Sequence, residues 1–272
     1  MASSTRQSLA SARAALQPLL ANAELSLASQ LFAVAGAVAG SAQLRNLLSD
    51  PSAEEKAKSG AVSAVFGKST LGFNLSADVL AFVTSLVALR WSKGSDLVSA
   101  LEQLGVYAAA SVAAKNGSIE TLANELFAFQ AAIESDSELQ FAFASKTATN
   151  EARLKLVTAL VGNKVSQEAQ LLINQAVVAS GKRRTSVVLD HFGKYVAQVA
   201  QQLVATVTVA QDIQAEQLSR IQAALSKKYG ASVKLNVQHD PSIIGGVRIQ
   251  IADEIIDGSL ISRLNQAKLS PA

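Results

Sequence analysis

The stretch that decides the fold runs from residue 240 to residue 264. It reads Asp240-Pro241-Ser242-Ile243-Ile244-Gly245-Gly246-Val247-Arg248-Ile249-Gln250-Ile251, then Ile255-Ile256-Asp257-Gly258-Ser259-Leu260 and Arg263-Leu264. A rigid X-Pro corner leads to two glycines and then to apolar residues that alternate with polar ones, which is the period of a half-buried strand. A short turn and a second strand are predicted next, followed by a terminal amphipathic helix.

Seven residues of this stretch are interpreted as determinants of the fold. Glycine supplies positive φ or a bulge where a strand begins, and Asp-Gly-Ser makes a turn whose side-chain oxygens cap the next helix. Direct contact with a ligand that approaches the backbone is the alternative. The seven residues are Asp240, Pro241, Gly245, Gly246, Asp257, Gly258 and Ser259.

The segment before this stretch completes a small module. Residues 203–209 are β-branched and alternating, which predicts a strand. A helical stripe over residues 218–225 is predicted to stop at Gly230, and alternation over residues 233–238 predicts a further strand. Residues 203–272 are therefore expected to form an α/β module.

The part of the chain before the module contains an internal sequence repeat. The run Leu27-Ala28-Ser29-Gln30-Leu31-Phe32-Ala33 returns 95 residues later as Leu122-Ala123-Asn124-Glu125-Leu126-Phe127-Ala128. Further matches pair Lys58 with Arg153, Gly67 with Gly162, Ser76 with Ser166, and Leu104-Gly105 with Phe192-Gly193. Chance similarity between alanine-rich helices is the alternative. A repeat of this length has the size of a domain, which predicts one copy over residues 1–105 and another over residues 106–202.

Each copy is expected to be a compact helical bundle. In the second copy Leu122, Leu126, Phe129 and Ile133 recur at helical spacing, and Ser135-Asp136-Ser137 breaks the pattern. Short helices with one apolar stripe must bury it against each other. The predicted fold class is mostly α, with two tandem helical-bundle copies followed by a small α/β C-terminal module.

Composition excludes several classes of site. The chain has 272 residues, of which 49% are hydrophobic, and its formal net charge of +3 implies no nucleic-acid partner. Without cysteine it has no thiol catalysis and no cysteine-based metal site. Two histidines, His191 and His239, are too few for a histidine-rich metal site. No cofactor and no metal ligand are predicted.

The membrane and targeting signals are weak as well. The longest apolar runs are shorter than the roughly 20 residues that cross a bilayer. These runs are residues 31–40, 79–91 and 104–114. The amino-terminal residues lack the uninterrupted apolar segment of a signal peptide. The chain is therefore expected in the cytoplasm.

Two short motifs have to be weighed as ligand sites. Phe66-Gly67-Lys68-Ser69-Thr70 ends like a phosphate-binding loop, but Val62 stands where the first glycine is needed and the preceding pattern is helical. Gly67 is therefore interpreted as a helix cap. Lys182-Arg183-Arg184 is interpreted as a solvated turn, with contact to phosphate or to an acidic protein surface as the alternative. No residues at motif spacing predict catalysis, so no catalytic residue is assigned.

The carboxy-terminal stretch resembles the signature of the delta subunit of bacterial rotary ATP synthases, whose mitochondrial counterpart is the oligomycin-sensitivity-conferring protein. The resemblance covers the second copy and the module. Further similar segments are Tyr107-Ala108, residues 115–120, Gly181-Lys182-Arg183-Arg184 and residues 204–210. The additional first copy resembles the duplicated helical domain of actinobacterial versions, and His239 departs from the apolar residue that is common there.

The resemblance implies a non-catalytic stator subunit of the proton-translocating ATP synthase, which links the catalytic head to the peripheral stalk and resists rotation. It implies that a helical bundle holds amino-terminal segments of the alpha subunits, and that the C-terminal module meets the b subunit of the stalk. It places the chain on the cytoplasmic face of the bacterial plasma membrane, as a peripheral protein attached through the complex.

Two questions stay open at the level of sequence. A generic helical adaptor that binds amphipathic helices of an unrelated partner is the alternative function, although it leaves the carboxy-terminal stretch unexplained. The doubling of the helical copy has no assigned role, and the hypothesis is that it adds a second grip or a longer and stiffer connection.

Overall fold

A computed structural model describes residues 3–67, 75–145, 147–162, 164–179, 183–202, 204–210, 213–229, 233–240, 246–251 and 254–257. The chain forms two compact units. One consists of Met1–Ala113 and Ile119–Val196, and the other of Ala114–Ser118 and Ala197–Ala272. The two units are referred to below as the helical unit and the C-terminal module.

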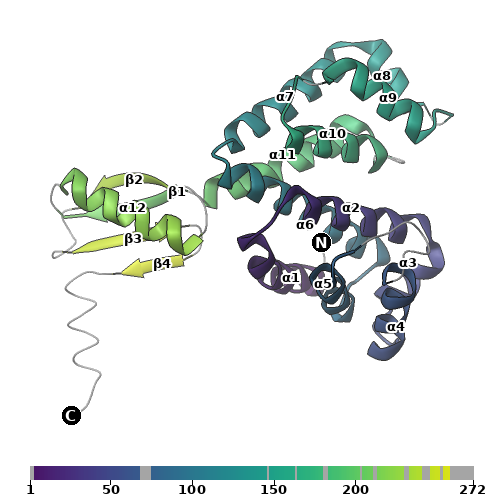
Figure 1. Cartoon of the computed structure of the whole chain (residues 1–272), viewed down its shortest axis with the longest axis horizontal. Coiled ribbons are helices and arrows are strands. Elements are labelled where there is room, and N and C mark those ends of the chain that lie inside the picture. Colours follow the sequence, from purple (N-terminus) through teal and green to yellow (C-terminus); the bar gives the residue numbers. More distant parts are fainter. Residues whose placement is uncertain are drawn as a thin grey trace. The chain divides into compact units, whose positions relative to one another are not determined.

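Eleven of the described helices precede the first strand (Figure 1). They are α1 (Ser3–Ala21), α2 (Leu25–Gly40), α3 (Ala42–Ser49), α4 (Glu55–Phe66), α5 (Ala77–Ala88), α6 (Gly94–Lys115), α7 (Ile119–Ser135), α8 (Ser137–Ala144), α9 (Asn150–Val161), α10 (Gln167–Ala179) and α11 (Thr185–Gln202). The prediction of a mostly α chain is confirmed. The stripe Leu122, Leu126, Phe129 and Ile133 is buried along α7, as helical periodicity predicts.

The order of helix lengths repeats, with α6 counted twice. From α1 to α6 the helices have 19, 16, 8, 12, 12 and 22 residues, and from α6 to α11 they have 22, 17, 8, 12, 13 and 18. Thus α6 closes the first series of helices and opens the second. The expected boundary between residues 105 and 106 lies inside this helix.

Helix ends fall at corresponding residues in both series. Ser41 caps α3 by accepting a hydrogen bond from the N–H of Leu44, and Asp136, 95 residues later, caps α8 in the same manner. Gly67 ends α4, and Gly162, again 95 residues later, ends α9 with a φ of 45° that favours glycine. Short polar residues and glycines thus set the same helix boundaries twice.

A long-range hydrogen bond is also duplicated. The side-chain oxygen of Gln30 in α2 accepts from the N–H of Ser76, at 2.7 Å, where α5 begins. In the second series Glu125 of α7 accepts from the N–H of Ser166, at 3.0 Å, and from its hydroxyl, where α10 begins. The two series therefore share tertiary contacts as well as sequence, and these contacts tie the second helix to the fifth in each.

The shared helix α6 is buried on every side along its middle. Every residue from Ala100 to Ala110 is buried, including Glu102 and Gln103. By length and composition alone, α6 is one described helix that could cross a membrane. The apolar run of residues 104–114 is too short to do so, but the helix that contains it is longer. Its most apolar window is 78% buried inside the fold, as expected of a core helix that packs on several sides.

The C-terminal module contains a four-stranded sheet in the order β2-β1-β3-β4 (Figure 1). Strand β1 (Val204–Val209) pairs in parallel with β2 (Lys234–His239) and antiparallel with β3 (Val247–Ile251), which pairs antiparallel with β4 (Glu254–Asp257). Helix α12 (Ala215–Tyr229) connects β1 to β2. The predicted strands and this helix are confirmed, whereas the predicted terminal helix lies outside the described residues.

Alternation along β1 builds the core of the module. Ala205, Val207 and Val209 are buried, and the threonines between them are half-buried. Leu225 of α12 and Ile251 of β3 meet the buried face in one apolar cluster. The C-terminal module therefore has its own core.

We expect Glu125→Ala to lower the free energy of unfolding by about 1–3 kcal/mol, because the substitution removes the acceptor of two hydrogen bonds from Ser166. Glu125→Gln is the matched control, since Gln30 makes the corresponding contact in the first series. This control should cost less than about 1 kcal/mol. Urea unfolding of both variants measures the difference, and equal losses would contradict the assigned role of the carboxylate.

Candidate functional site

The two helical series meet in a region that we call the seam. It is made by α1, α2, α6, α11 and the turn before α11. Its residues are Arg13, Phe32, Glu102, Gly105, Tyr107, Arg183, Phe192 and Tyr195. The seam brings together aromatic, charged and closely packed side chains of both helical series, and it is the candidate site.

Aromatic stacking forms the apolar part of the seam. The rings of Phe32 in α2 and Phe192 in α11 lie 6.3 Å apart between centroids, with their planes 17° from parallel. Both side chains are buried. Offset stacking of this kind contributes about 0.5–1.5 kcal/mol beyond the burial of area. The stack thus joins a helix of the first series directly to the last helix of the second.

Gly105 makes room for the ring of Phe32 against α6. A Cβ atom built on Gly105 would lie 2.5 Å from Cε1 of Phe32, closer than real Cβ contacts. The ring is buried, so it cannot swing into solvent to make space. Glycine at this position is therefore required by close packing between α2 and α6.

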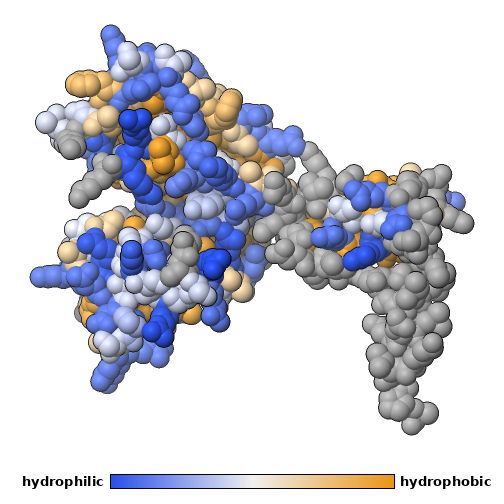
Figure 2. All heavy atoms as spheres, turned by 180° about the vertical axis from the view of Figure 1, so that it is seen from behind, coloured by the Kyte–Doolittle hydropathy of each residue, from blue (hydrophilic) through white to orange (hydrophobic). Residues whose placement is uncertain are grey.

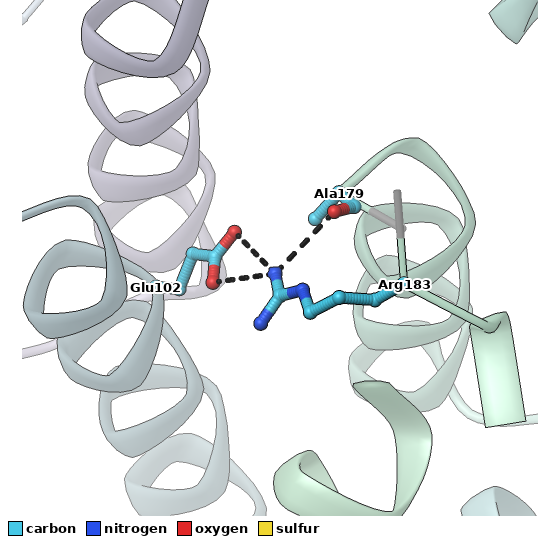
Figure 3. A network of polar contacts seen from close by, with 3 residues as sticks. All are labelled: Glu102, Ala179 and Arg183. Carbon is cyan, nitrogen blue, oxygen red and sulfur yellow. Dashed lines mark hydrogen bonds and ion pairs between the residues drawn. The ribbon is translucent and has the colours of Figure 1, made fainter. Parts of the chain in front are cut away.

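An ion pair forms part of the polar side of the seam (Figure 3). One guanidinium nitrogen of Arg183 lies 3.3 Å from a carboxylate oxygen of Glu102 and 3.4 Å from the carbonyl oxygen of Ala179. The Glu102 side chain is 10% exposed, and that of Arg183 is 41% exposed. Arg183, in the basic turn predicted to be solvated, thus pairs with an acidic residue of its own chain. Lys182 lies outside the described residues.

The carboxyl of Glu102 titrates in an unusual setting. Burial raises its pKa above the ordinary value of 4.5, and the Arg183 guanidinium offsets part of that increase. Loss of hydration therefore disfavours the charged Glu102 carboxylate, and the nearby Arg183 guanidinium favours it. The pair fixes the approach of the turn before α11 to α6, at a cost in desolvation.

Arg13 of α1 links the two tyrosines of the seam. Its guanidinium lies 4.3 Å from the centroid of the Tyr107 ring, which is a cation–π contact. Burial raises the pKa of both Tyr107 and Tyr195, and Arg13 opposes the increase in each case. The tyrosines stand two residues after Gly105 and Gly193, so the repeated Gly-x-Tyr pattern supplies both partners.

The described residues offer no arrangement for catalysis. No group of three or more His, Cys, Asp or Glu among them could hold a metal ion. His191 is exposed on α11. Gly67 ends a helix by donating its N–H to the carbonyl of Ser63, so α4 precedes it where a phosphate-binding loop would need a strand. Lys68, Ser69 and Thr70 lie outside the described residues.

Three of the seven carboxy-terminal fold residues are described. The N–H of Asp240 donates to the carbonyl of Val209 at 3.0 Å, which extends the pairing of β1 and β2. Gly246 has a φ of 87° directly before β3, and Asp257 ends β4 opposite Arg248. The remaining four lie outside the described residues; they are Pro241, Gly245, Gly258 and Ser259.

Comparison with known proteins covers both helical series. Residues 105–270 match the family model described as ATP synthase delta (OSCP) subunit. Proteins named ATP synthase subunit delta are similar over nearly the whole chain. Those of Pseudarthrobacter chlorophenolicus and Leifsonia xyli are 37% and 38% identical, over 98% and 100% of both chains. That of Streptomyces coelicolor is 35% identical over 98% of this chain and 97% of its own.

We expect Gly105→Ala to lower the free energy of unfolding by about 1–3 kcal/mol, because the new methyl group collides with the Phe32 ring. Gly193→Ala is the matched control. It lies within α11 with no described atom within 4 Å of its Cβ position, and should stabilise by up to about 1 kcal/mol through helix propensity. Thermal and urea unfolding measure both changes. A stabilising Gly105→Ala would show that the seam is loose.

The raised pKa of Glu102 predicts a pH dependence of stability. Between the ordinary pKa and the raised one, the folded chain holds more protons than the unfolded chain. The associated stability is fully present below pH 4.5 and is lost as pH rises through the folded pKa. Glu102→Gln should therefore become more stable relative to the wild type as pH rises. Urea unfolding from pH 4 to pH 7 tests this, and identical slopes in both proteins would refute it.

Proposed function

This chain belongs to the ATP synthase delta (OSCP) subunit family, and on that premise we propose how it works within the complex. It is a non-catalytic stator subunit that links the catalytic head of a proton-translocating ATP synthase to the peripheral stalk. Its task is to resist rotation of the head while the rotor turns. This task requires binding that withstands torque, and it requires no catalysis.

The observation that carries the proposal is the match over nearly the full length of relatives named ATP synthase subunit delta. The seam supports it in physical terms. A stiffer stator deforms less under a given torque, whereas a hinge between the two helical series would let the head turn further before the torque is balanced. The Phe32 stack and the Glu102–Arg183 pair hold the series together, so the helical unit is suited to act as one body.

We assign partners to the two units as membership of the family implies. A helical unit can hold an amphipathic helix against its apolar surface, and the amino-terminal segments of the alpha subunits are the proposed ligands. The C-terminal module is proposed to meet the b subunit of the stalk. The chain then lies on the cytoplasmic face of the bacterial plasma membrane, as a peripheral protein that reaches the membrane through the complex.

The seam favours one explanation for the doubled helical copy. Two grips on a flexible tether would need no shared helix, whereas a longer and stiffer connection needs one continuous core. Burial of α6 between Ala100 and Ala110 provides such a core. We propose that doubling lengthens the stiff part of the stator.

Reconstitution tests the function. The catalytic head is stripped from bacterial membranes, freed of its own delta subunit, and rebuilt with or without the purified chain. We expect ATP-driven proton pumping only when the chain is present, because an unanchored head turns with the rotor. Acidification inside the vesicles reports pumping, and ATP hydrolysis by the bound head is the control.

Two outcomes would overturn parts of the proposal. Equal pumping with and without the chain, in preparations shown to lack a native delta subunit, would favour an adaptor with an unrelated partner. The assignment of the stalk contact is tested separately by removing residues 203–272. A fragment with unchanged helical circular dichroism that still binds the b subunit as tightly as the full chain would refute it.

A further inference from the structure

The turn between α6 and α7 contains the one asparagine of the sequence that precedes a glycine. Helix α6 ends at Lys115, Asn116 and Gly117 follow in the turn, and α7 begins at Ile119. Both turn residues are exposed. Gly117 has a φ of 69°, and no described atom lies within 4 Å of a Cβ built on it. Water therefore reaches the dipeptide, and glycine has no side chain to shield its nitrogen.

The first series contains a corresponding turn with alanine in place of glycine. Asn22 directly follows α1, as Asn116 directly follows α6, and both asparagines are exposed. The next residue makes the same hydrogen bond in each turn: the N–H of Ala23 donates to the carbonyl of Leu20 at 3.2 Å, and the N–H of Gly117 donates to the carbonyl three residues earlier at 3.1 Å. The repeat thus supplies a reference turn that differs in the residue after asparagine.

An exposed asparagine before glycine can react with its own backbone. The nitrogen of Gly117, once it loses its proton, attacks Cγ of Asn116. The new N–Cγ bond closes a five-membered imide, and the Cγ–Nδ2 bond breaks to release ammonia, which takes up the proton. Water then opens the imide at one of its two carbonyls. One opening gives aspartate, and the other gives isoaspartate, in which the main chain runs through the former side chain. A Cβ atom on the attacking residue hinders ring closure, and glycine has none.

We propose that Asn116 is a site of spontaneous deamidation, and that its conversion to aspartate and isoaspartate alters the junction of α6 and α7 as the protein ages. The reaction consumes one water molecule and releases one ammonia molecule, and it needs no enzyme. It goes beyond the proposed function, because it depends only on this chain and holds whatever partners the chain binds.

Conversion changes both the charge and the length of the turn. The new carboxylate precedes a segment that has five acidic residues and no lysine or arginine between Ile119 and Ala144. Asn116 is exposed, and the described surface on the face in Figure 2 is mostly hydrophilic, so the added charge stays hydrated and the helices remain folded. Isoaspartate also adds one backbone atom before Gly117, which displaces its N–H from the carbonyl of Ala114. We therefore expect a local loosening at the end of α6.

Peptide mapping of the full chain tests the site. The purified chain is incubated at neutral and at alkaline pH and digested, and mass spectrometry detects the replacement of an amide by an acid. Asn116 should convert about tenfold or more faster than Asn22, because only Asn116 precedes glycine. The rate should rise with pH, since the attacking nitrogen must lose its proton. The mass change separates this reaction from isomerisation at Asp257-Gly258, which leaves the mass unchanged. Equal rates at Asn116 and Asn22 would overturn the inference.

Exchange of the second residue between the two turns tests the mechanism. Ala23→Gly should raise the deamidation rate of Asn22 by about tenfold, and Gly117→Ala should lower that of Asn116 by a similar factor. Alanine at position 117 must adopt the positive φ of Gly117, so circular dichroism confirms that this variant is folded. Ala23→Gly carries no such strain and tests the mechanism alone if the other variant fails to fold. An unchanged rate at Asn22 in Ala23→Gly would refute the role of glycine.

Hydrogen exchange tests the structural consequence. The chain aged at alkaline pH should exchange the amide hydrogens of residues 115–118 faster than the fresh chain. Asn116→Gln, aged in the same way, is the matched control, because its longer side chain would have to close a six-membered ring. It should exchange these hydrogens like the fresh chain. Equal exchange in the aged wild type, with conversion at Asn116 confirmed by mass, would show that the reaction leaves the end of α6 intact and would refute this part of the proposal.

Discussion

The packing of Phe32 into the space left by Gly105 is the contact on which the helical unit depends. It brings α2 so close to α6 that one additional carbon atom would not fit. With α2 in that position, the Phe32 ring also meets Phe192, and a helix of the first series touches the end of the second. A single glycine thus sets the distance between α2 and α6, and with it the stacking of Phe32 on Phe192.

Polar contacts at the seam add direction to this packing. The Glu102–Arg183 pair brings the turn before α11 to α6, and Arg13 lies over Tyr107 from α1. The Glu102–Arg183 pair contributes little net stability, because burial of the carboxylate costs much of what the partly exposed guanidinium returns. Their effect is to favour one arrangement of the helices over its neighbours. For a part that must transmit torque, a defined arrangement matters more than additional free energy.

Periodicity and repetition in the sequence predict most of the elements, but few of the contacts between them. The stripe from Leu122 to Ile133 and the alternation around Val207 place a helix and a strand correctly, because burial follows local spacing. The duplication shows which residues correspond, yet not which faces meet. Phe32 and Phe127 have similar sequence surroundings and different exposure, because Phe32 packs against α6 at Gly105 and against Phe192. The pairing of Glu102 with Arg183 joins residues 81 positions apart, and no local pattern marks it.

The double role of α6 has a consequence for how such a protein can grow. Because α6 ends one series and begins the next, a further series needs only five new helices, as α7 to α11 show. Helix α11 repeats the Gly-x-Tyr pattern of α6, so the chain already ends its helical unit with a helix of the joining type. The architecture is therefore extendable, because the last helix of each series can also serve as the first helix of the next.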